Sequence, residues 1–182
     1  MKPVCLVVGA GAGIGGTVGK RFAADGYHAV LCRRSDEEGL NALVADIEAS
    51  GGSASGRLLN AVQPDAIEDC VAWVEKDIGP IQVIVFNLGA QVGNRSLTNT
   101  TYKTFELGWR MATFALFRVA SSTFPLMAER GGGTLLVTSA TAAVRGNAGQ
   151  HSHAAAMGGR RMLCQSLNAE FSDQNIHVAH IL

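Results

Sequence analysis

Short apolar runs alternate along the chain with longer segments in which apolar residues recur every three or four positions. The runs are rich in β-branched residues and predict strands at 3–9, 28–32, 55–59, 81–87, 133–139 and 176–182. The intervening segments predict helices at 13–26, 36–50, 64–78, about 100–130 and about 152–173. This alternation indicates an α/β fold in which right-handed crossovers join parallel strands and helices cover both faces of the sheet.

No repeat, low-complexity stretch or flexible linker interrupts this alternation. Residues 1–182 are therefore expected to form a single domain. The helix predicted over 64–78 would hold Pro64 in its first turn, where the missing N–H of proline is not needed.

The balance of charges argues against several classes of partner. Lys and Arg together number 15, as do Asp and Glu, so the formal net charge is 0 and no overall field attracts nucleic acid or an anionic membrane. No signal peptide is apparent and no apolar run reaches the length of a membrane span. The cysteines Cys5, Cys32, Cys70 and Cys164 are far apart in apolar segments, which indicates reduced, buried thiols and a cytoplasmic protein.

A glycine-rich string follows the first predicted strand and opens the first predicted helix. It contains Gly9, Gly11, Gly13, Gly15 and Gly16. Glycines at this place let the backbone turn tightly and approach a pyrophosphate, whose charge the helix N-terminus stabilises. Because the string lies between a strand and a helix in a βαβ unit, it predicts a dinucleotide site more strongly than a run of glycines alone would.

Two arginines follow the second predicted strand. A site for NAD would place an acidic residue there to bind the ribose 2'-hydroxyl, whereas this chain has Arg33 and Arg34. Guanidinium groups suit a 2'-phosphate, so the sequence favours NADP over NAD. The alternative is that both are ordinary solvated charges at a strand end.

The spacing of Gly9, Gly13, Ile14 and Gly15 resembles that of the short-chain dehydrogenase/reductase family, and the likeness extends over the whole chain. The resemblance implies a Rossmann-like doubly wound sheet of strand order 3-2-1-4-5-6. It also implies cofactor-binding roles for Asn87 and Gly89 in the stretch FNLG, and for Asn60, which stands where the family usually has an aspartate near the adenine.

The family's catalytic positions are all substituted here. Members usually reduce carbonyls or oxidise alcohols with a nicotinamide cofactor, using tyrosine, lysine, serine and asparagine. By the family's spacing these positions fall on His153, Met157, Ala140 and Ala112. A histidine has an unperturbed pKa of about 6.5, so His153 is the candidate catalytic acid. Methionine can neither tune that histidine nor hold a ribose hydroxyl.

Neighbouring hydroxyl groups offer substitutes for the missing serine. Ser139 precedes Ala140, but consecutive strand residues face opposite sides, so its hydroxyl is expected to point away from the site. Thr138 and Thr141 are further candidates.

The histidines do not predict a metal site. His151 and His153 supply two imidazoles, and His177 and His180 two more. The latter pair, however, is an odd number of residues apart on one strand, so the two side chains point to opposite faces. No acidic residue or cysteine lies beside the first pair, and catalytic zinc usually has three protein ligands.

The family resemblance also bears on assembly and length. It implies dimers or tetramers formed through the helices at about 100–130 and about 152–173. Family members generally continue past the sixth strand into a substrate-binding segment, whereas this chain stops at Leu182, so it is either a fragment or a shortened variant. The sheet edge at the sixth strand would then need a partner to cover it.

Three functions are compatible with these observations. The first is an NADP-dependent oxidoreductase that transfers hydride to or from a small carbonyl or alcohol. The second is an inactive NADP-binding sensor or partner subunit. The third is a structural oligomer component without nucleotide binding, which the glycine string and the arginine pair disfavour.

Overall fold

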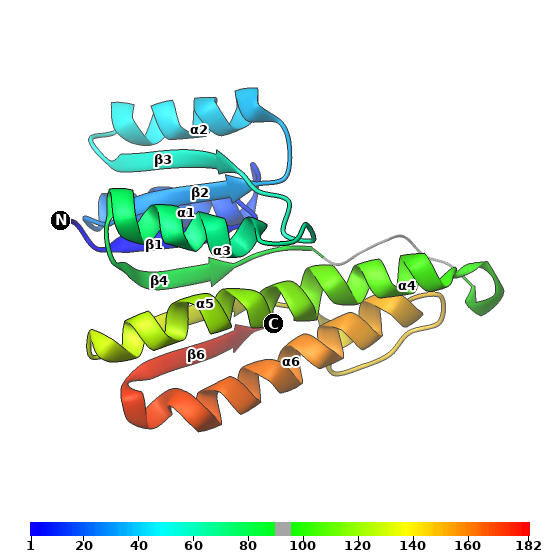
Figure 1. Ribbon diagram of the computed structural model, residues 1–182. Helices are drawn as coiled ribbons and strands as arrows, with labels where there is room; N and C mark the ends of the chain where they lie inside the picture. Colours follow the sequence, from blue (N-terminus) through cyan, green and yellow to red (C-terminus); the bar gives the residue numbers. More distant parts are fainter. Residues whose placement is uncertain (90–95) are drawn as a thin grey trace.

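The structure is a computed structural model that describes residues 1–89 and 96–182, and within these ranges it contains a six-stranded parallel sheet (Figure 1). The strands are β1 (Val4–Val8), β2 (His28–Arg33), β3 (Ser53–Leu58), β4 (Ile81–Phe86), β5 (Gly133–Thr138) and β6 (Ile176–Ile181). Their order is β3-β2-β1-β4-β5-β6 and every neighbouring pair is parallel. The predicted fold class and strand order are therefore confirmed.

The helices lie where the apolar periodicity predicts them, with shifted ends. They are α1 (Ile14–Ala24), α2 (Glu37–Ala49), α3 (Ala66–Trp73), α4 (Tyr102–Trp109), α5 (Ala115–Glu129) and α6 (His151–Phe171). The π-helical segments are η1 (Val74–Ile78) and η3 (Arg110–Phe114), and the 3-10 segments are η2 (Leu97–Asn99), η4 (Thr141–Ala143) and η5 (Ser172–Gln174). The helix expected over about 100–130 is thus divided, because η3 separates α4 from α5.

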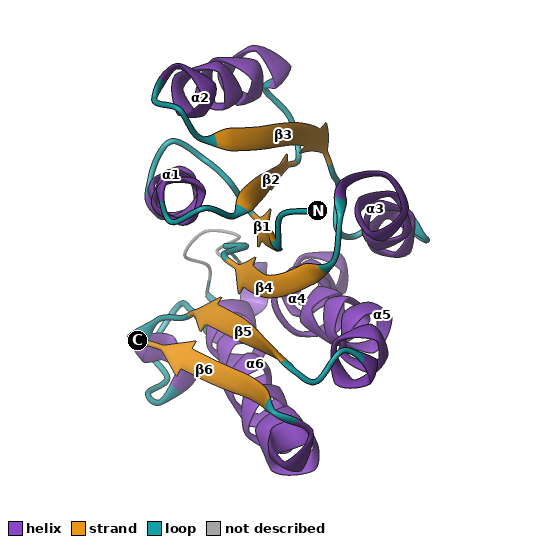
Figure 2. Ribbon diagram, turned by 90° about the vertical axis from the view of Figure 1, so that its left-hand side faces the viewer, coloured by secondary structure: helices purple, strands orange, loops and turns teal. Residues whose placement is uncertain are grey.

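Helices cover both faces of the sheet, as Figure 2 shows for α1 and α3. Alternate side chains of β1 enter two different cores: Leu6 packs with residues of α3, α5 and α6, whereas Val7 packs with residues of α1 and α2. Both side chains are essentially inaccessible to solvent. Parallel strands buried on both faces are expected to be continuously apolar, which explains the sequence VCLVV.

The start of α3 differs from the prediction. Pro64 lies outside the helix, which begins at Ala66 after Asp65 has adopted a left-handed conformation with φ 59°. The turn before the helix therefore uses the fixed φ of proline, and the expectation that Pro64 occupies the first helical turn is wrong.

The helical stretch Tyr102–Glu129 contains 28 residues and is long and apolar enough, by length and composition, to cross a membrane. Half of its most apolar window is buried inside the fold, as in a core helix that packs on a sheet.

Candidate functional site

The first glycine of the string forms a tight turn at the carboxyl end of β1. Gly9 has φ +103°, a conformation that side-chain-bearing residues rarely adopt. The carbonyl oxygen of Cys32 accepts hydrogen bonds from the N–H groups of Gly9 and Ala10, at 2.9 and 2.8 Å. A Cβ on Gly9 would lie 2.7 Å from the carbonyl oxygen of Asn87. The turn therefore requires glycine and is fixed by both neighbouring strands.

The following glycines bring the backbone close together and leave one side open. Gly15 packs directly on the backbone of Gly9, where a Cβ has no room, whereas a Cβ on Gly13 would meet nothing within 4 Å. Helix α1 begins at Ile14 and its N-cap Gly13 makes no side-chain cap hydrogen bond. The first N–H groups of a helix have no intrahelical partners. The residues present therefore fit a pyrophosphate at this opening.

A hollow of about 250 Å³ lies beside this loop, between α1, the end of β2 and the start of α2. It is lined by Ala12, Gly16, Thr17, Lys20, Arg33, Asp36, Gly39 and Leu43. Arg33 makes a 3.0 Å salt bridge to Asp36, which also accepts a 3.0 Å hydrogen bond from the N–H of Gly39 at the start of α2. The predicted Arg33 thus lines the hollow, whereas Arg34 is an exposed residue next to it.

Sequence reasoning missed two charged residues of this hollow. Lys20 lies on the face of α1 that also carries Gly16 and Thr17, and it pairs with Asp46 of α2. Its spacing of four residues from Gly16 is the signal that could have found it. Asp36 was missed because its role depends on a left-handed backbone, with φ 68°, at the N-cap of α2.

Asn60 lies just after β3 and is half-buried. Its side-chain oxygen accepts a 3.4 Å hydrogen bond from the N–H of Val62, which closes a local turn. The structure thus places Asn60 at the carboxyl edge of the sheet, with its amide oxygen in contact with its own loop.

Asn87 connects the glycine turn to β5. Its side-chain Nδ2 donates a 3.0 Å hydrogen bond to the carbonyl oxygen of Gly9, and its Oδ1 accepts a 2.8 Å hydrogen bond from the hydroxyl of Thr138. Gly89 follows, and a Cβ there would meet nothing within 4 Å. The structure therefore brings Gly9, Gly15 and Asn87 together and leaves open space at Gly89.

Three of the positions that the family resemblance identifies as catalytic lie in an apolar cluster. Ala112 of η3 and Met157 of α6 are buried and share one hydrophobic cluster with Ala142, Ala143 and Ala156, against which Ala140 packs. Three of the four positions that the family resemblance identifies are thus in one place, and none of these three carries a polar group. The cluster offers no hydroxyl, amide or ammonium group for proton transfer.

His153 occupies the first turn of α6, one turn before Met157. Its Nδ1 atom is buried and has no hydrogen-bond partner among the described residues, and the same is true of the hydroxyl oxygen of Ser139. Thr138 is already bonded to Asn87, and Thr141 is exposed on η4. The three hydroxyl groups near Ala140 thus differ: that of Ser139 is buried without a partner among the described residues, that of Thr138 donates to Asn87, and Thr141 is exposed.

Arg160 is the functional candidate that sequence reasoning missed. It is 1% exposed, and its guanidinium donates to the carbonyl oxygens of Ala112, Thr138 and Leu88, at 3.2, 2.9 and 2.7 Å. The group also lies 5.0 Å from the centre of the Phe86 ring. Burial lowers its pKa to about 10. A cation therefore remains in this region, three residues after the position where the family has lysine.

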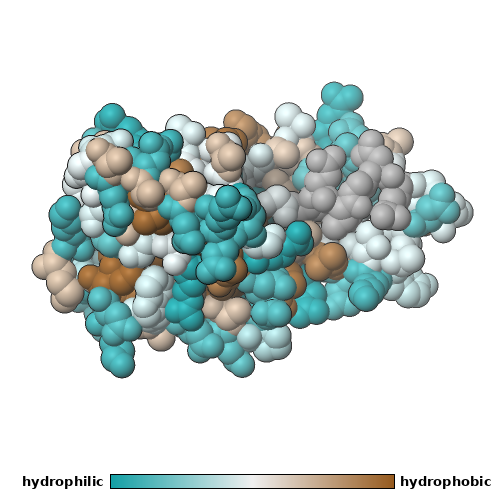
Figure 3. All heavy atoms as spheres, turned by 90° about the horizontal axis from the view of Figure 1, so that it is seen from above, coloured by the Kyte–Doolittle hydropathy of each residue, from teal (hydrophilic) through white to brown (hydrophobic). Residues whose placement is uncertain are grey.

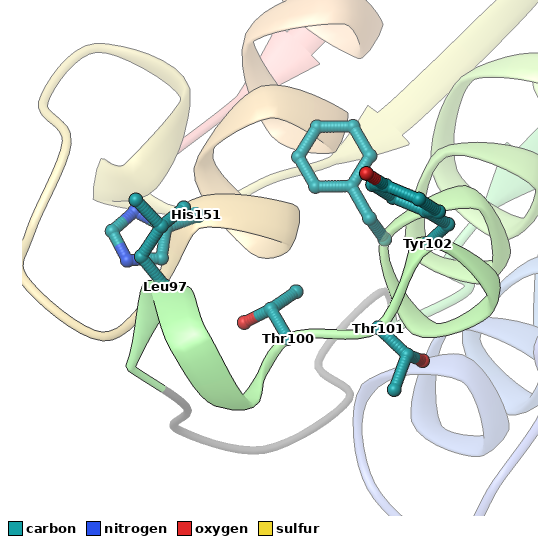
Figure 4. Close-up of a pocket in the computed structure, with 6 residues that line it drawn as sticks. Leu97, Thr100, Thr101, Tyr102 and His151 are labelled. Atoms are coloured by element: carbon teal, nitrogen blue, oxygen red, sulfur yellow. The ribbon is translucent and has the colours of Figure 1, made fainter.

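A second, larger hollow of about 740 Å³ lies between η2, α4 and the start of α6 (Figure 4). It is lined by Leu97, Thr100, Thr101, Tyr102, Phe105 and His151. His151 is the first residue of α6, two positions before His153. The lining is mostly apolar, which suits a substrate with a hydrophobic part.

Strand β6 carries two histidines. His177 is exposed on β6, and His180 is half-buried on the same strand with Nε2 lacking a partner among the described residues. In residues 1–89 and 96–182, no group of three or more His, Cys, Asp or Glu side chains could hold a metal ion.

Comparison with known proteins agrees with this geometry. The family profile described as short chain dehydrogenase matches residues 3–182. A short-chain dehydrogenase from Rhodopseudomonas palustris is 38% identical, with a TM-score of 0.93 over 98% of this chain and 82% of that chain. A metagenomic short-chain oxidoreductase, solved in complex with NADP, is 25% identical, with a TM-score of 0.91 over 98% of this chain and 80% of that one.

Among curated proteins, the short-chain reductase protein NovJ of Streptomyces niveus is 32% identical over 183 residues, covering 97% of this chain and 66% of NovJ. The chain spans about two thirds of the length of the curated relatives it matches, between 66% and 70% for the first three. The match over nearly all of its own length, together with the sheet order and the glycine turn, identifies its family. The chain belongs to the short-chain dehydrogenase family.

Proposed function

We propose that this chain is an NADP(H)-binding oxidoreductase that transfers hydride to or from a small carbonyl or alcohol. The observation that carries the proposal is the hollow beside the glycine turn, whose lining includes the cations Lys20 and Arg33. Arg33 pairs there with Asp36, and Lys20 pairs with Asp46, which lies outside the lining. A 2'-phosphate there would meet positive charge, and a guanidinium binds phosphate through paired donors. This supports NADP over NAD as the preferred cofactor.

The cofactor would be held by the residues already described. Gly9, Gly13, Ile14 and Gly15 would bind the pyrophosphate, and Arg33 the 2'-phosphate, with Arg34 adding an exposed charge. Asn60, Asn87 and Gly89 would line the remaining path along the carboxyl edge of the sheet. The bound cofactor supplies the hydride chemistry, and the chain supplies position and charge.

His153 would be the residue that donates or accepts the proton during hydride transfer. It is the one titratable side chain at the four substituted positions, and an imidazole suits acid–base work near neutral pH. Met157 offers it no cation. Arg160 keeps a positive charge on the same helix, but its donors are used by the carbonyls of Ala112, Thr138 and Leu88.

An inactive NADP(H)-binding sensor or partner subunit is the second candidate. The apolar cluster of Ala112, Ala140 and Met157 favours it, because a proton relay needs polar groups at each step. The glycine turn and the hollow at Arg33 would be retained for binding alone.

Assembly into a homodimer or homotetramer is proposed through the α4–α5 region and α6. Trp109, Phe114 and Phe117 form a ladder of stacked rings on this helical stretch, with centroids 5.5 and 6.4 Å apart, and all three are exposed. On the face that carries α2, hydrophobic residues form only small separate areas among hydrophilic ones (Figure 3). Buried thiols support placement of the assembly in the cytoplasm.

Assays of NADPH oxidation with a panel of small aldehydes and ketones separate the two candidates. The oxidoreductase is expected to turn over at least one carbonyl, and His153→Ala is expected to lower kcat by about 100-fold or more while leaving NADPH affinity unchanged. Turnover that appears only in the double variant His153→Tyr, Met157→Lys would overturn the oxidoreductase proposal and support the inactive binder.

A further inference from the structure

Two cysteines from different elements meet in the core. Cys32 is near the end of β2, Cys70 lies on α3, and their sulfur atoms are 3.6 Å apart. Each residue is 1% exposed. The sulfurs are in van der Waals contact, and a disulfide of about 2.05 Å would need them to approach by about 1.5 Å. Bond formation therefore requires the two sulfur atoms to move toward each other by this amount.

The surroundings distinguish the two thiols. Arg57 of β3 is the register partner of Cys32, and its guanidinium lies 5.0 Å from the centre of the Trp73 ring on α3. The hydrogen bond between the two thiols and the charge of Arg57 lower the pKa of Cys70, whereas the same hydrogen bond and burial raise the pKa of Cys32. The lowered pKa makes Cys70 the better nucleophile of the two thiols.

The remaining cysteines provide an internal comparison. Burial raises the pKa of Cys5 to about 12 and that of Cys164 to about 11. Both are buried thiols without the sulfur contact that joins Cys32 to Cys70. Because all four thiols are buried, a higher reactivity of Cys32 and Cys70 than of Cys5 and Cys164 would have to come from the sulfur contact.

The pair is joined to the glycine turn through the backbone. The carbonyl of Cys32 accepts both hydrogen bonds that hold Gly9 and Ala10, and Arg33 is the next residue. A displacement of Cys32 would therefore move the acceptor that fixes the turn and the guanidinium that lines the adjacent hollow.

We propose that Cys32 and Cys70 are an oxidisable dithiol, converted by hydrogen peroxide into a reversible disulfide that alters the glycine turn. The Cys70 thiolate attacks one peroxide oxygen, so that an S–O bond forms, the O–O bond breaks and the departing oxygen leaves as water after protonation. Cys32 then attacks the Cys70 sulfenic acid. The S–S bond forms, the S–O bond breaks, and a second water leaves with the proton of Cys32.

Two electrons pass from the thiols to the peroxide, and a dithiol reductant reverses the change. Because α3 covers the pair, the reaction proceeds through local opening of this short helix. The effect on NADP(H) affinity rests on the proposed function, whereas disulfide formation does not.

The test treats the folded protein with hydrogen peroxide and maps its thiols by mass spectrometry. The expected product is a Cys32–Cys70 linked peptide, with Cys5 and Cys164 still free, and dithiothreitol restores both thiols. Cys70→Ala is expected to abolish the linked peptide, whereas the matched variant Cys5→Ala is expected to retain it. Four free thiols after treatment, or oxidation of all four at similar rates, would overturn the proposal.

NADPH titration of the two redox forms tests the link to the glycine turn. The disulfide form is expected to bind NADPH at least fivefold more weakly than the reduced form, by about 1 kcal/mol. Equal affinities overturn the link. If the linked peptide forms but neither redox form binds NADPH or NADH, the proposed cofactor site fails while the dithiol stands.

Discussion

The Nε atom of Arg160 donates a 3.2 Å hydrogen bond to the carbonyl oxygen of Ala112, joining α6 to the π-helical segment η3. Ala112 stands where the family usually has asparagine, so this position contributes its backbone and no polar side chain. The same guanidinium reaches the carbonyls that follow β4 and end β5. Arg160 thus joins α6 to three other parts of the fold, around the positions that the family resemblance identifies as catalytic.

Replacing Arg160 with methionine is expected to lower the free energy of unfolding by about 3 kcal/mol or more, because three buried carbonyls lose their donor. Arg160→Lys should be intermediate, since one ammonium cannot reproduce the planar fork of donors. Urea denaturation measures both effects. The neighbouring Arg161→Met is the matched control, expected within about 0.5 kcal/mol of wild type. Equal losses at both arginines would contradict the role given to Arg160.

The glycine turn predicts a contrast within one loop. Gly9→Ala forces a side chain into a left-handed conformation and against Asn87, which should cost about 1–3 kcal/mol of stability and abolish cofactor binding. Gly11→Ala has open space around its added methyl group and is expected to fold and bind as wild type does. Thermal melts and NADPH titrations of the pair check this. A Gly9→Ala protein that binds normally would show that the turn does not position the cofactor.

The sequence predicts the fold because its strongest signals are local. Apolar runs and helical periodicity require only neighbouring residues, and the turn at Gly9 has its own glycine signature. Segment ends were less accurate, as at Pro64, because the left-handed Asp65 that starts α3 leaves no clear mark in the sequence.

The site was predicted less completely. Arg160 contacts backbone carbonyls 22 to 72 residues away along the chain. Every residue has such a carbonyl, so the types of the contacted residues do not reveal the contacts. Lys20 and Asp36 reach the hollow at Arg33 only because α1 and α2 pack beside each other. Contacts of this kind follow from tertiary packing, and only the spacing of Lys20 from Gly16 gives a local sign of them.

Acid should weaken the ion pair that joins α3 to α5. A hydrogen bond from Arg118 lowers the pKa of Glu68. A lowered carboxyl pKa stabilises the fold above the unfolded value of about 4.3, and this contribution is lost as the pH falls through the folded value. The side chain of Glu68 is 42% exposed, so solvent screening limits the effect to below about 1 kcal/mol.

Glu68→Gln should therefore lose less stability than wild type between pH 7 and pH 3, and the two proteins should converge at the acid end. Urea midpoints across this range measure the difference. The exposed Glu129→Gln on α5 serves as the control and should follow wild type. If the stability of Glu68→Gln fell with pH as steeply as that of wild type, the ion pair would not contribute to the acid sensitivity of the fold.

The aromatic ladder predicts the mode of assembly. Trp109 and Phe117 are 43% and 49% exposed, and charged residues at both positions should oppose burial against a second copy. Trp109→Glu combined with Phe117→Glu is expected to give monomers by size-exclusion chromatography with light scattering. Leu58→Glu, at a similarly exposed apolar residue on the β3 edge, should leave the oligomer intact. Dissociation by Leu58→Glu alone would place the interface elsewhere.

Equilibrium titration of the wild-type chain with NADPH and NADH measures whether the hollow at Arg33 selects a 2'-phosphate. We expect NADPH to bind at least tenfold more tightly, and Arg33→Ala to remove most of that preference by weakening NADPH binding by about 1.5–3 kcal/mol. NADH affinity should change little in the variant. Binding of neither nucleotide, or tighter binding of NADH by the wild type, would contradict the account.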